Sequence, residues 1–429
     1  MKLNITNVGK IGSATFEFNG ITVIAGNNNT GKSTVGKSLF SLFHRFLNIN
    51  NAVKNHRYNA FIKRVKNLDL KYGDGDNWWQ PRDELVNKYN LKDVRKFLEN
   101  ELDIKDIRST VNSIIMYDGP DKEAFYEELL SGLSEVKSIS DNRLKEELVT
   151  LFFNNIFASQ INNVQAKVAK AELELKIKNK PLRVAFEDSQ CVLVEDNVTL
   201  TNKAIYIDDP YAIDLDFRYR LYNQSVGRDY INNILAGLLH TNNSDDLVDK
   251  IIATDKYKEI ECIIDRVIKG NLIENKRGIF TLQNEDFPKG LSVNNISTGV
   301  KSFLVIKKLI TDNIISEKDV LIFDEPEIHL HPEWQILYAE LLVLIQKYFD
   351  LTILLTTHSP FFLRAIEVFS KKYETEEKCT YYMAKIKNEY SIFEKINDTS
   401  DVYAKMADAF SVLDKINDDI EESNNCEDM

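Results

Sequence analysis

The chain has 429 residues and a net charge of −12, and 43% of its residues are hydrophobic, which is ordinary for a folded protein. Its 8 prolines and 16 glycines exclude a collagen-like or Pro/Gly-rich disordered chain, and no apolar run approaches the ~20 residues needed to span a bilayer. The start has no apolar leader and the cysteines do not cluster. We therefore expect a cytoplasmic protein without membrane contact, zinc ribbons or disulfides.

The N-terminal residues predict strands, a glycine-bearing loop and a helix. Residues 1–18 alternate loosely between polar and apolar, and residues 21–25 form a short β-rich run, which predicts two strands. A loop follows at 26–31, and apolar residues spaced three or four apart predict a helix from Lys32.

The middle of the chain has a helical pattern and one β-rich stretch. Residues 45–165 are helical and charged, with a loop around Trp78-Trp79. Polar and apolar residues alternate over 170–210, which predicts a small, mostly antiparallel sheet, with a further short strand at 204–207.

The C-terminal part predicts strands of a parallel sheet. Helical character returns over 215–270, and a short strand at 278–282 precedes a helix predicted over 299–310. Two near-continuous apolar runs follow, at 320–323 and 351–355, separated by a helix-sized segment. Runs that are apolar on both faces are typical of central strands in a parallel sheet.

The loop after the β-rich run carries the strongest motif. It reads GNNNTGKS and matches GxxxxGK[ST], a phosphate-binding loop. Its glycines permit the backbone angles that turn successive N–H groups inward, and the following helix adds its positive end. Lys32 would reach the β- and γ-phosphates, and Ser33 would ligate Mg²⁺. The candidate ATP-binding residues are Gly26, Asn27, Asn28, Asn29, Thr30, Gly31, Lys32, Ser33 and Thr34.

The first of the two apolar runs ends in Asp324 and Glu325, which is the Walker B pattern. Asp324, fixed at the strand end, would hold Mg²⁺ through water, and Glu325 would polarise the attacking water. The structural alternative is a buried strand that ends in a solvated acidic turn. The phosphate loop in the same chain favours the catalytic interpretation.

Two further patterns each have a structural alternative. His358, in the run TTHSP after the second apolar run, could contact the γ-phosphate and sense its loss, although a lone histidine is usually structural. Ser297, Thr298 and Gly299 precede a predicted helix, where a hydroxyl, a glycine backbone and a helix N-terminus make an anion site. The alternative there is a simple helix N-cap.

The chain carries four motifs in this order: GNNNTGKST, NNISTGVKSF, VLIFDEPEIHLHPEWQ and LLTTHSP. They resemble those of the ABC-type ATPases of the SMC, RecF and OLD group rather than transporter subunits. The resemblance implies an α/β fold: a P-loop head with a central, mostly parallel sheet, an antiparallel β subdomain and two helical insertions. It implies ATP and Mg²⁺ as ligands, with Glu325 and the switch histidine His358 as catalytic residues. Ser297, Thr298 and Gly299 would act in trans on ATP held by a second head.

Two features depart from this resemblance. Thr298 stands where transporters carry glycine. The strand 204–207 is in a matching place for the strand that precedes the Mg²⁺-ligating glutamine of this class, but Asp208-Asp209-Pro210 follows it. Four glutamines are possible by spacing and none is convincing: Gln80, Gln160, Gln190 and Gln224.

The combined pattern predicts six segments. They are an N-terminal ATPase lobe with the phosphate loop (1–44), a helical insertion (45–165), the β subdomain (166–212), a second short helical insertion (213–272), a C-terminal ATPase lobe with the signature, Walker B and switch histidine (273–415), and an acidic, disordered tail (416–429).

The resemblance also implies a biological role. Its EPEIHLHP run resembles that of the soluble members found in DNA repair and phage defence, and the chain looks most like the PtuA-type ATPases of the Septu and certain retron systems. This implies an oligomeric ATPase and sensor subunit of a bacterial antiviral defence complex, with a separately encoded HNH-type nuclease as partner. The alternative is a RecF-like repair or recombination ATPase that binds DNA directly. A transporter subunit fits less well, because the signature is atypical and helices are inserted.

Three segments could bind partners or belong to the protein's own core. Trp78-Trp79 could anchor a partner, and the helix around Tyr403 could be an interface, although its spacing is more often that of a core helix. A third segment interleaves basic and aromatic residues and could bind nucleic acid, or be a solvated helical face with buried aromatics. Its residues are Lys54, His56, Arg57, Tyr58, Phe61, Lys63, Arg64, Lys66, Lys71 and Tyr72.

Overall fold

The computed structural model describes residues 1–72, 115, 117, 119–163, 170–215, 225–240, 257–275, 278–397, 399–400, 402–403 and 415–417. The chain divides into two compact units: Met1–Leu47 with Thr150–Met429, and Asn48–Val149. The predicted loop at Trp78-Trp79 lies outside the described residues, as does most of the predicted C-terminal helix. The six segment boundaries predicted from the sequence stay predictions.

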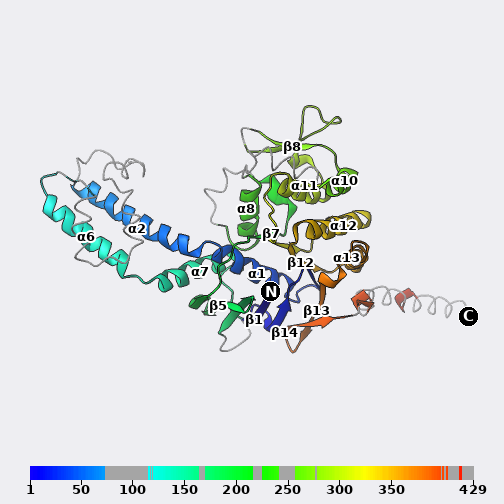
Figure 1. The fold of residues 1–429 in the computed structure, drawn as a ribbon, viewed down its shortest axis with the longest axis horizontal. Helices are drawn as coiled ribbons and strands as arrows, with labels where there is room; N and C mark the ends of the chain where they lie inside the picture. Colours follow the sequence, from blue (N-terminus) through cyan, green and yellow to red (C-terminus); the bar gives the residue numbers. More distant parts are fainter. Residues whose placement is uncertain are drawn as a thin grey trace, which may run out of the picture. The chain divides into compact units, whose positions relative to one another are not determined.

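The first unit contains the described strands and most of the described helices (Figure 1). Its strands are β1 (Lys2–Val8), β2 (Ile11–Glu17), β3 (Ile21–Gly26), β4 (Ala171–Ile177), β5 (Lys180–Glu187), β6 (Gln190–Asp196), β7 (Ala204–Ile207), β8 (Asn271–Glu274), β9 (Phe280–Gln283), β10 (Leu291–Ser292), β11 (Val320–Asp324), β12 (Thr352–Thr357), β13 (Cys379–Lys387) and β14 (Tyr390–Ile396). Its helices are α1 (Lys32–Phe46), α8 (Arg228–Leu239), α10 (Lys258–Val267), α11 (Thr298–Thr311), α12 (Pro332–Phe349) and α13 (Pro360–Lys372), with the short 3₁₀ helices η1 (Pro210–Asp214), η3 (Val293–Asn295) and η4 (Glu376–Lys378).

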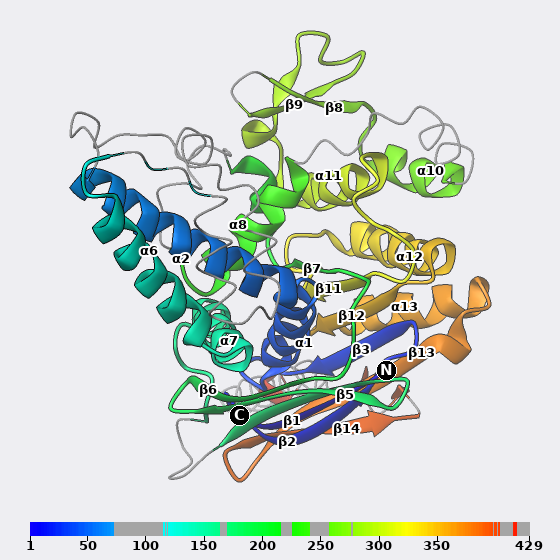
Figure 2. The same ribbon diagram turned by 60° about the vertical axis from the view of Figure 1, so that its left-hand side comes forward.

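Eleven of the described strands form one sheet, in the order β6-β5-β4-β1-β2-β14-β13-β3-β12-β11-β7. The five strands from β13 to β7 are parallel, and the predicted apolar runs are its interior strands β11 and β12. The antiparallel strands β4, β5 and β6 are not a separate sheet, because β4 pairs with β1 and so extends the same sheet (Figure 2). The predicted α/β class with a parallel centre and an antiparallel part is confirmed.

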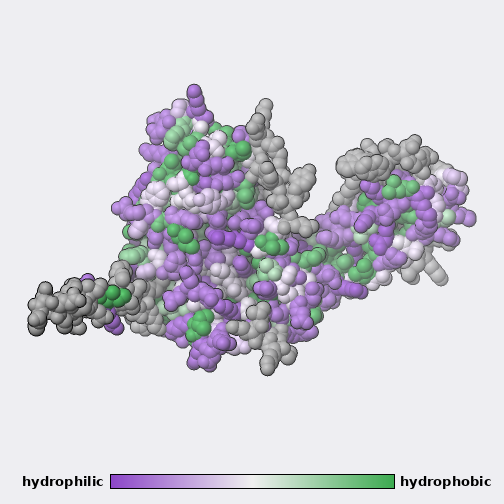
Figure 3. All heavy atoms as spheres, turned by 180° about the vertical axis from the view of Figure 1, so that it is seen from behind, coloured by the Kyte–Doolittle hydropathy of each residue, from purple (hydrophilic) through white to green (hydrophobic). Residues whose placement is uncertain are grey.

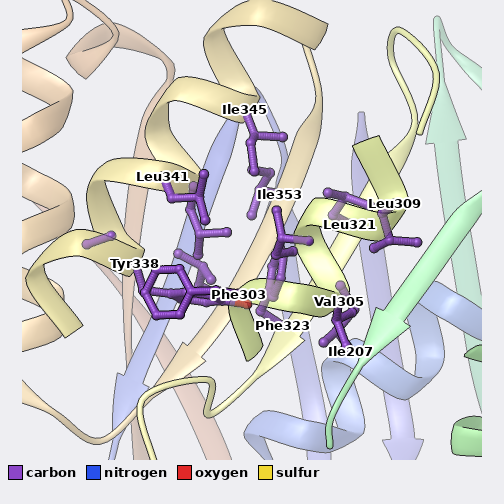
Figure 4. Close-up of a cluster of buried hydrophobic side chains, with 14 of the residues drawn as sticks. Ile207, Phe303, Val305, Leu309, Leu321, Phe323, Tyr338, Leu341, Ile345 and Ile353 are labelled. Carbon is purple, nitrogen blue, oxygen red and sulfur yellow. The ribbon is translucent and has the colours of Figure 1, made fainter. Parts of the chain in front are cut away.

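Helices cover both faces of the parallel strands (Figures 1 and 2). On one face, Phe323 of β11 packs with Phe303 of α11 and Tyr338 of α12 (Figure 4). On the other face, Ile322 lies against α1, where a Cβ placed on Gly36 would be 3.0 Å from its side chain. Because successive strand residues alternate between two buried faces, the run is apolar at every position, which made it recognisable in the sequence.

The surface of the first unit is mixed in character. On the face seen in Figure 3, apolar side chains are scattered among polar ones over the described residues. Three exposed apolar side chains lie close to the amino ends of α12 and α13: Ile328, Ile336 and Phe361. No described helix is both long enough and apolar enough to cross a membrane.

The second unit is built on an antiparallel helix pair, α2 (Ile49–Tyr72) and α6 (Lys122–Ser138), followed by the start of α7 (Asp141–Phe157). It has its own hydrophobic core, in which Phe61 of α2 and Phe125 of α6 are fully buried. The ring of Phe125 stacks on Tyr117 with centroids 4.2 Å apart. The unit therefore buries apolar surface independently of the sheet.

Several α2 side chains that the sequence predicted could bind nucleic acid have other contacts in the structure. Tyr58 and Phe61 are in the core of the second unit, so their rings are not available to stack on bases. Arg57 pairs with Asp141 at 2.7 Å, and Arg64 with a glutamate of α6 at 3.0 Å. These contacts favour the structural alternative for this segment.

Candidate nucleotide site

The phosphate loop connects the carboxyl end of β3 to the amino end of α1. Gly31 lies in the left-handed region at φ 80°, which glycine adopts without strain, and immediately precedes the helix. Thr30 is buried, and its hydroxyl donates to the carbonyl of Asn27 at 2.8 Å. Asn28 and Asn29 are exposed, and Thr34 lies in the first turn of α1. The predicted residues thus form one curved loop at the start of a helix.

Lys32 is a buried lysine, with its residue 3% exposed. Its ammonium donates to the carbonyls of Gly26 and Asn27, both at 2.9 Å, and lies 3.3 Å from Oε1 of Glu325. These acceptors offset the cost of burying the charge. The ammonium therefore lies across the phosphate loop and beside the Walker B glutamate.

Asp324 ends β11 and receives three hydroxyl donors from three elements. Ser33 of α1 donates to Oδ1 at 3.1 Å, Thr356 of β12 also donates to Oδ1, and Tyr206 of β7 donates to Oδ2 at 2.8 Å. Burial, followed by the nearby charge of Asp324, raises the pKa of Tyr206 well above its ordinary value, so this hydroxyl stays a donor. The carboxylate is thereby held at the carboxyl edge of the parallel strands.

Glu325 directs its carboxylate between the side chains of Lys32 and His358. Its backbone has φ 51°, uncommon for a residue with a Cβ, and its N–H donates to the backbone and side-chain oxygens of Thr356 at 3.1 and 3.0 Å. Oε1 lies near Lys32, and Oε2 is 3.7 Å from Nδ1 of His358. The structure thus brings together the lysine, the glutamate and the histidine predicted from three separate motifs.

The signature residues occupy the amino end of α11. Ser297 is the N-cap residue, is exposed, and its side chain makes no capping hydrogen bond. The hydroxyl of Thr298 instead lies 2.7 Å from that of Tyr211 in η1. A Cβ on Gly299 would be 2.9 Å from the carbonyl of His329, so the helix approaches the loop after β11 too closely for a side chain. Among the described residues, no hydrogen bond or ion pair joins these three positions to the phosphate loop.

Comparison with known proteins places the chain in a family. The model of a family described as "AAA domain, putative AbiEii toxin, Type IV TA system" matches residues 21–364, from the phosphate-loop strand to beyond His358. The chain belongs to this AAA-domain family. The matched residues include the phosphate loop, the Walker B strand β11 and His358. No curated protein matches the sequence.

Several solved structures resemble this family member at low identity. One is an SMC head domain from Thermotoga maritima, with 10% identity, a TM-score of 0.38, and coverage of 92% of this chain and 98% of that chain. Another is an Smc head bound to the C-winged helix domain of ScpA, with 11% identity, a TM-score of 0.41, and coverage of 92% and 97%. A third is an Smc head domain with an extended coiled coil, bound to the C-terminal domain of ScpA derived from Pyrococcus furiosus, with 9% identity, a TM-score of 0.40, and coverage of 97% and 98%.

The residues at the edge of the sheet fit a magnesium ion. Mg²⁺ prefers oxygen ligands, and the hydroxyl of Ser33 and the carboxylate of Asp324 lie 3.1 Å apart beside the phosphate loop. Two of the glutamines considered as a further ligand, Gln80 and Gln224, lie outside the described residues. Gln190 begins β6, at the opposite end of the sheet order from β7, and so is remote from this edge.

Asp208 holds the position next to Asp324 on the neighbouring strand. β7 pairs with β11 in parallel and Ile207 is opposite Phe323, so Asp208 ends its strand at the same edge. Arg228 binds the carboxylate of Asp208 through two nitrogens, at 2.5 and 2.9 Å. Burial, and then repulsion from Asp324, raise the pKa of Asp208 to about 6.

Sequence reasoning missed three residues of this site. Tyr206 lies on a predicted strand and Thr356 directly follows one, but nothing in the strand pattern shows that their hydroxyls meet one carboxylate. The third, Glu327, lies three residues after Asp324 and is 2% exposed. The one sequence feature that could have pointed to Glu327 is that it is the second glutamate of the run EPE.

Proposed function

We propose that this chain binds ATP with Mg²⁺ and hydrolyses it. The observation that carries the proposal is the Glu325 carboxylate, which lies between Lys32 of the phosphate loop and His358 at the end of β12. A water-positioning carboxylate, a phosphate-binding lysine and a histidine beside them are what phosphoryl transfer to water requires. Asp208 and Arg228 extend the charged edge of the site.

The residues have separate tasks in this mechanism. Ser33 and Asp324 would hold Mg²⁺, which would neutralise phosphate charge. Lys32 exchanges its present acceptors for phosphate oxygens, and this frees the Glu325 carboxylate to orient a water and accept its proton. The backbone N–H groups of the loop and the amino end of α1 bind the remaining phosphate charge. His358 contacts the γ-phosphate and reports its loss.

We also propose that two copies pair with ATP between them. Ser297 is exposed at a helix amino end with its hydroxyl unused for capping, so it is available to phosphate oxygens of a second subunit. The exposed side chains of Ile328, Ile336 and Phe361 surround the amino ends of α12 and α13 and would be covered by such a partner. Because Thr298 contacts Tyr211, its role in this pairing is to position the signature segment.

The biological role proposed is that of the ATPase and sensor subunit of a cytoplasmic antiphage complex, controlling a separate HNH-type nuclease. It is supported by the resemblance of the chain to PtuA-type ATPases, whereas the EPEIHLHP run alone resembles soluble ATPases of both DNA repair and phage defence. The RecF-like alternative needs direct DNA binding, and the burial of Tyr58 and Phe61 counts against the segment expected to supply it. The matching family's description names a putative toxin: a chain that is itself a toxin would arrest growth when expressed alone, whereas a regulatory subunit would not.

ATP turnover and binding by point variants test the catalytic proposal. Glu325→Gln should lower turnover about 10²–10⁴-fold and leave ATP binding intact, because it removes the proton acceptor. Lys32→Ala should weaken ATP binding about 10-fold or more, since it deletes a charged hydrogen-bond donor. Glu187→Gln, an exposed glutamate at the end of β5 in the antiparallel part of the sheet, is the matched control and should behave as wild type. Equal turnover in Glu325→Gln and the control would refute hydrolysis at this site.

Purification from the native operon tests the partner. The tagged chain, expressed with its neighbours, is isolated with ATP and Mg²⁺, and the masses that co-purify are measured. A stable multimer with a nuclease-like polypeptide supports the defence role. A chain that pairs only with ATP and DNA supports the RecF-like alternative. Growth arrest by the chain alone supports the hypothesis that the chain is itself a toxin.

A further inference from the structure

Glu327 is a buried carboxylate on the loop that follows Walker B, and its contacts converge on one neighbouring segment. Its Oε1 accepts from the hydroxyl of Thr357 at 2.5 Å and from the backbone N–H of His358 at 2.9 Å. The same oxygen lies 3.5 Å from Nδ1 of His358. One carboxylate oxygen therefore contacts the backbone and the ring of the residue proposed to sense the γ-phosphate.

A structural role alone does not require a carboxylate at this position. Glu327 is 2% exposed, and its Oε2 is buried with no hydrogen-bond partner among the residues that the structure describes. Burial raises the pKa of Glu327, against the opposing effect of the hydrogen bonds from Thr357 and His358. A glutamine of the same shape could accept both hydrogen bonds without a charge, so the negative charge itself calls for an explanation.

The geometry around His358 explains why a negative charge is placed at Glu327. Nδ1 faces two carboxylates, Oε1 of Glu327 at 3.5 Å and Oε2 of Glu325 at 3.7 Å. A carboxylate beside Nδ1 favours the tautomer that carries its proton there, and leaves Nε2 for the substrate. Glu325 cannot hold the ring while it orients water, whereas Glu327 has no access to solvent and keeps one position. Both distances from Nδ1 are longer than an ordinary hydrogen bond, as is common for catalytic contacts before the substrate binds.

We propose that Glu327 is a positioning residue for ATP hydrolysis: its buried carboxylate fixes the orientation and tautomer of His358, so that Nε2 faces the γ-phosphate. The two glutamates of the EPE run then have different tasks, since Glu325 acts on water and Glu327 acts only through His358. This inference rests on the proposed function for its effect on turnover. Its effect on the histidine ring does not depend on turnover.

The first test is kinetic and uses Glu327→Gln, His358→Gln and the double variant. Glu327→Gln should lower kcat about 10- to 100-fold, the range measured when partners that orient a functional histidine are removed, and change KM for ATP less than twofold. Because Glu327 acts through His358, the double variant should be no slower than His358→Gln alone. If Glu327→Gln lowers kcat by the same factor in both backgrounds, the inference is wrong.

The matched control is Glu340→Gln. Glu340 is also a buried glutamate, 6% exposed, but it binds Lys372 and Tyr373 on α13 instead of His358. The Glu340→Gln variant should be less stable than wild type and have an unchanged kcat. Should Glu327→Gln fail to fold, Thr357→Val removes the hydroxyl that anchors the carboxylate at nearly unchanged shape. Thr357→Val should then lower kcat only in chains that retain His358.

The second test reads the ring directly in the full chain. The sequence has six histidines, so ¹⁵N-histidine labelling gives a short set of ring signals, and His358→Gln identifies the one required. Glu327→Gln should shift the Nδ1 and Nε2 resonances of His358 towards a mixture of tautomers. Unchanged resonances overturn the inference. A shift in a protein that shows no ATP turnover would leave the positioning role standing and reject hydrolysis instead.

Discussion

Asp324 receives hydroxyl hydrogen bonds from Ser33, Thr356 and Tyr206, and only Tyr206 lies outside the four sequence motifs. The strand that carries it was predicted, but the direction of its side chain depends on the parallel pairing of β7 with β11. Tyr206 is opposite Ile322 in that register, so its ring faces α1 and its hydroxyl reaches Asp324, the last residue of β11. Tyr206 therefore links the strand at the sheet edge to the proposed metal ligand.

Removing that hydroxyl should reduce stability. Tyr206→Phe deletes the donor to Oδ2 of Asp324, and a hydrogen bond to a charged group contributes about 1.5–3 kcal/mol to the free energy of unfolding. Urea unfolding measures the loss. The control is Tyr338→Phe, also a fully buried tyrosine, whose ring packs among apolar residues of α11 and β11 (Figure 4). Equal losses in both variants would show that the bond to Asp324 contributes nothing.

At the scale of elements, local patterns predicted what each segment is, and long-range pairing decided where it lies. The phosphate loop, β11 and the helix after the signature could be predicted because each is specified by a few consecutive residues. The joining of β4–β6 to β1 could not, since Leu173 pairs with Ile5 across a long stretch of chain and the antiparallel pattern is the same in a separate sheet. The contact of Glu327 with His358 is likewise set by tertiary packing.

The short helix η1 connects the end of β7 to the signature helix. Tyr211 contacts Thr298, and Asp214 pairs with the buried Lys301 at 2.5 Å. The ammonium of Lys301 also lies 4.6 Å from the centre of the Tyr211 ring. Because Asp208 lies two residues before η1 and at the same sheet edge as Asp324, η1 links the proposed magnesium site to the signature residues.

Breaking this link should impair ATP-driven pairing. Lys301→Met leaves Asp214 half-buried without its cation, which costs about 3 kcal/mol or less given the partial exposure of Asp214. The signature segment should loosen, so that light scattering with ATP shows weaker dimer formation in a Glu325→Gln background. Lys308→Met removes another buried lysine of α11, one that pairs with Asp312 and does not contact η1. Comparable dimer loss in both variants would assign the effect to general destabilisation.

At the scale of the whole molecule, the chain consists of two units with separate cores. The first buries Phe303 and Phe323 between α11, α12 and the sheet, and the second buries Phe61 and Phe125 between α2 and α6. The candidate site residues all belong to the first unit. Loss of packing in the second unit should therefore be separable from nucleotide chemistry.

Phe125→Ala tests this separation. Phe125 is fully buried and contacts Tyr72, Tyr117 and Tyr126, so truncation should cost about 3–5 kcal/mol within Asn48–Val149. Hydrogen exchange should rise in α2 and α6 while ATP turnover stays within about twofold, because the first unit keeps its own core. Phe303→Ala, an equally buried residue of the signature helix itself, should instead raise exchange around α11 and α12 and lower ATP binding. If Phe125→Ala raises exchange equally in both units, the two cores unfold together and the second unit is needed for the stability of the first.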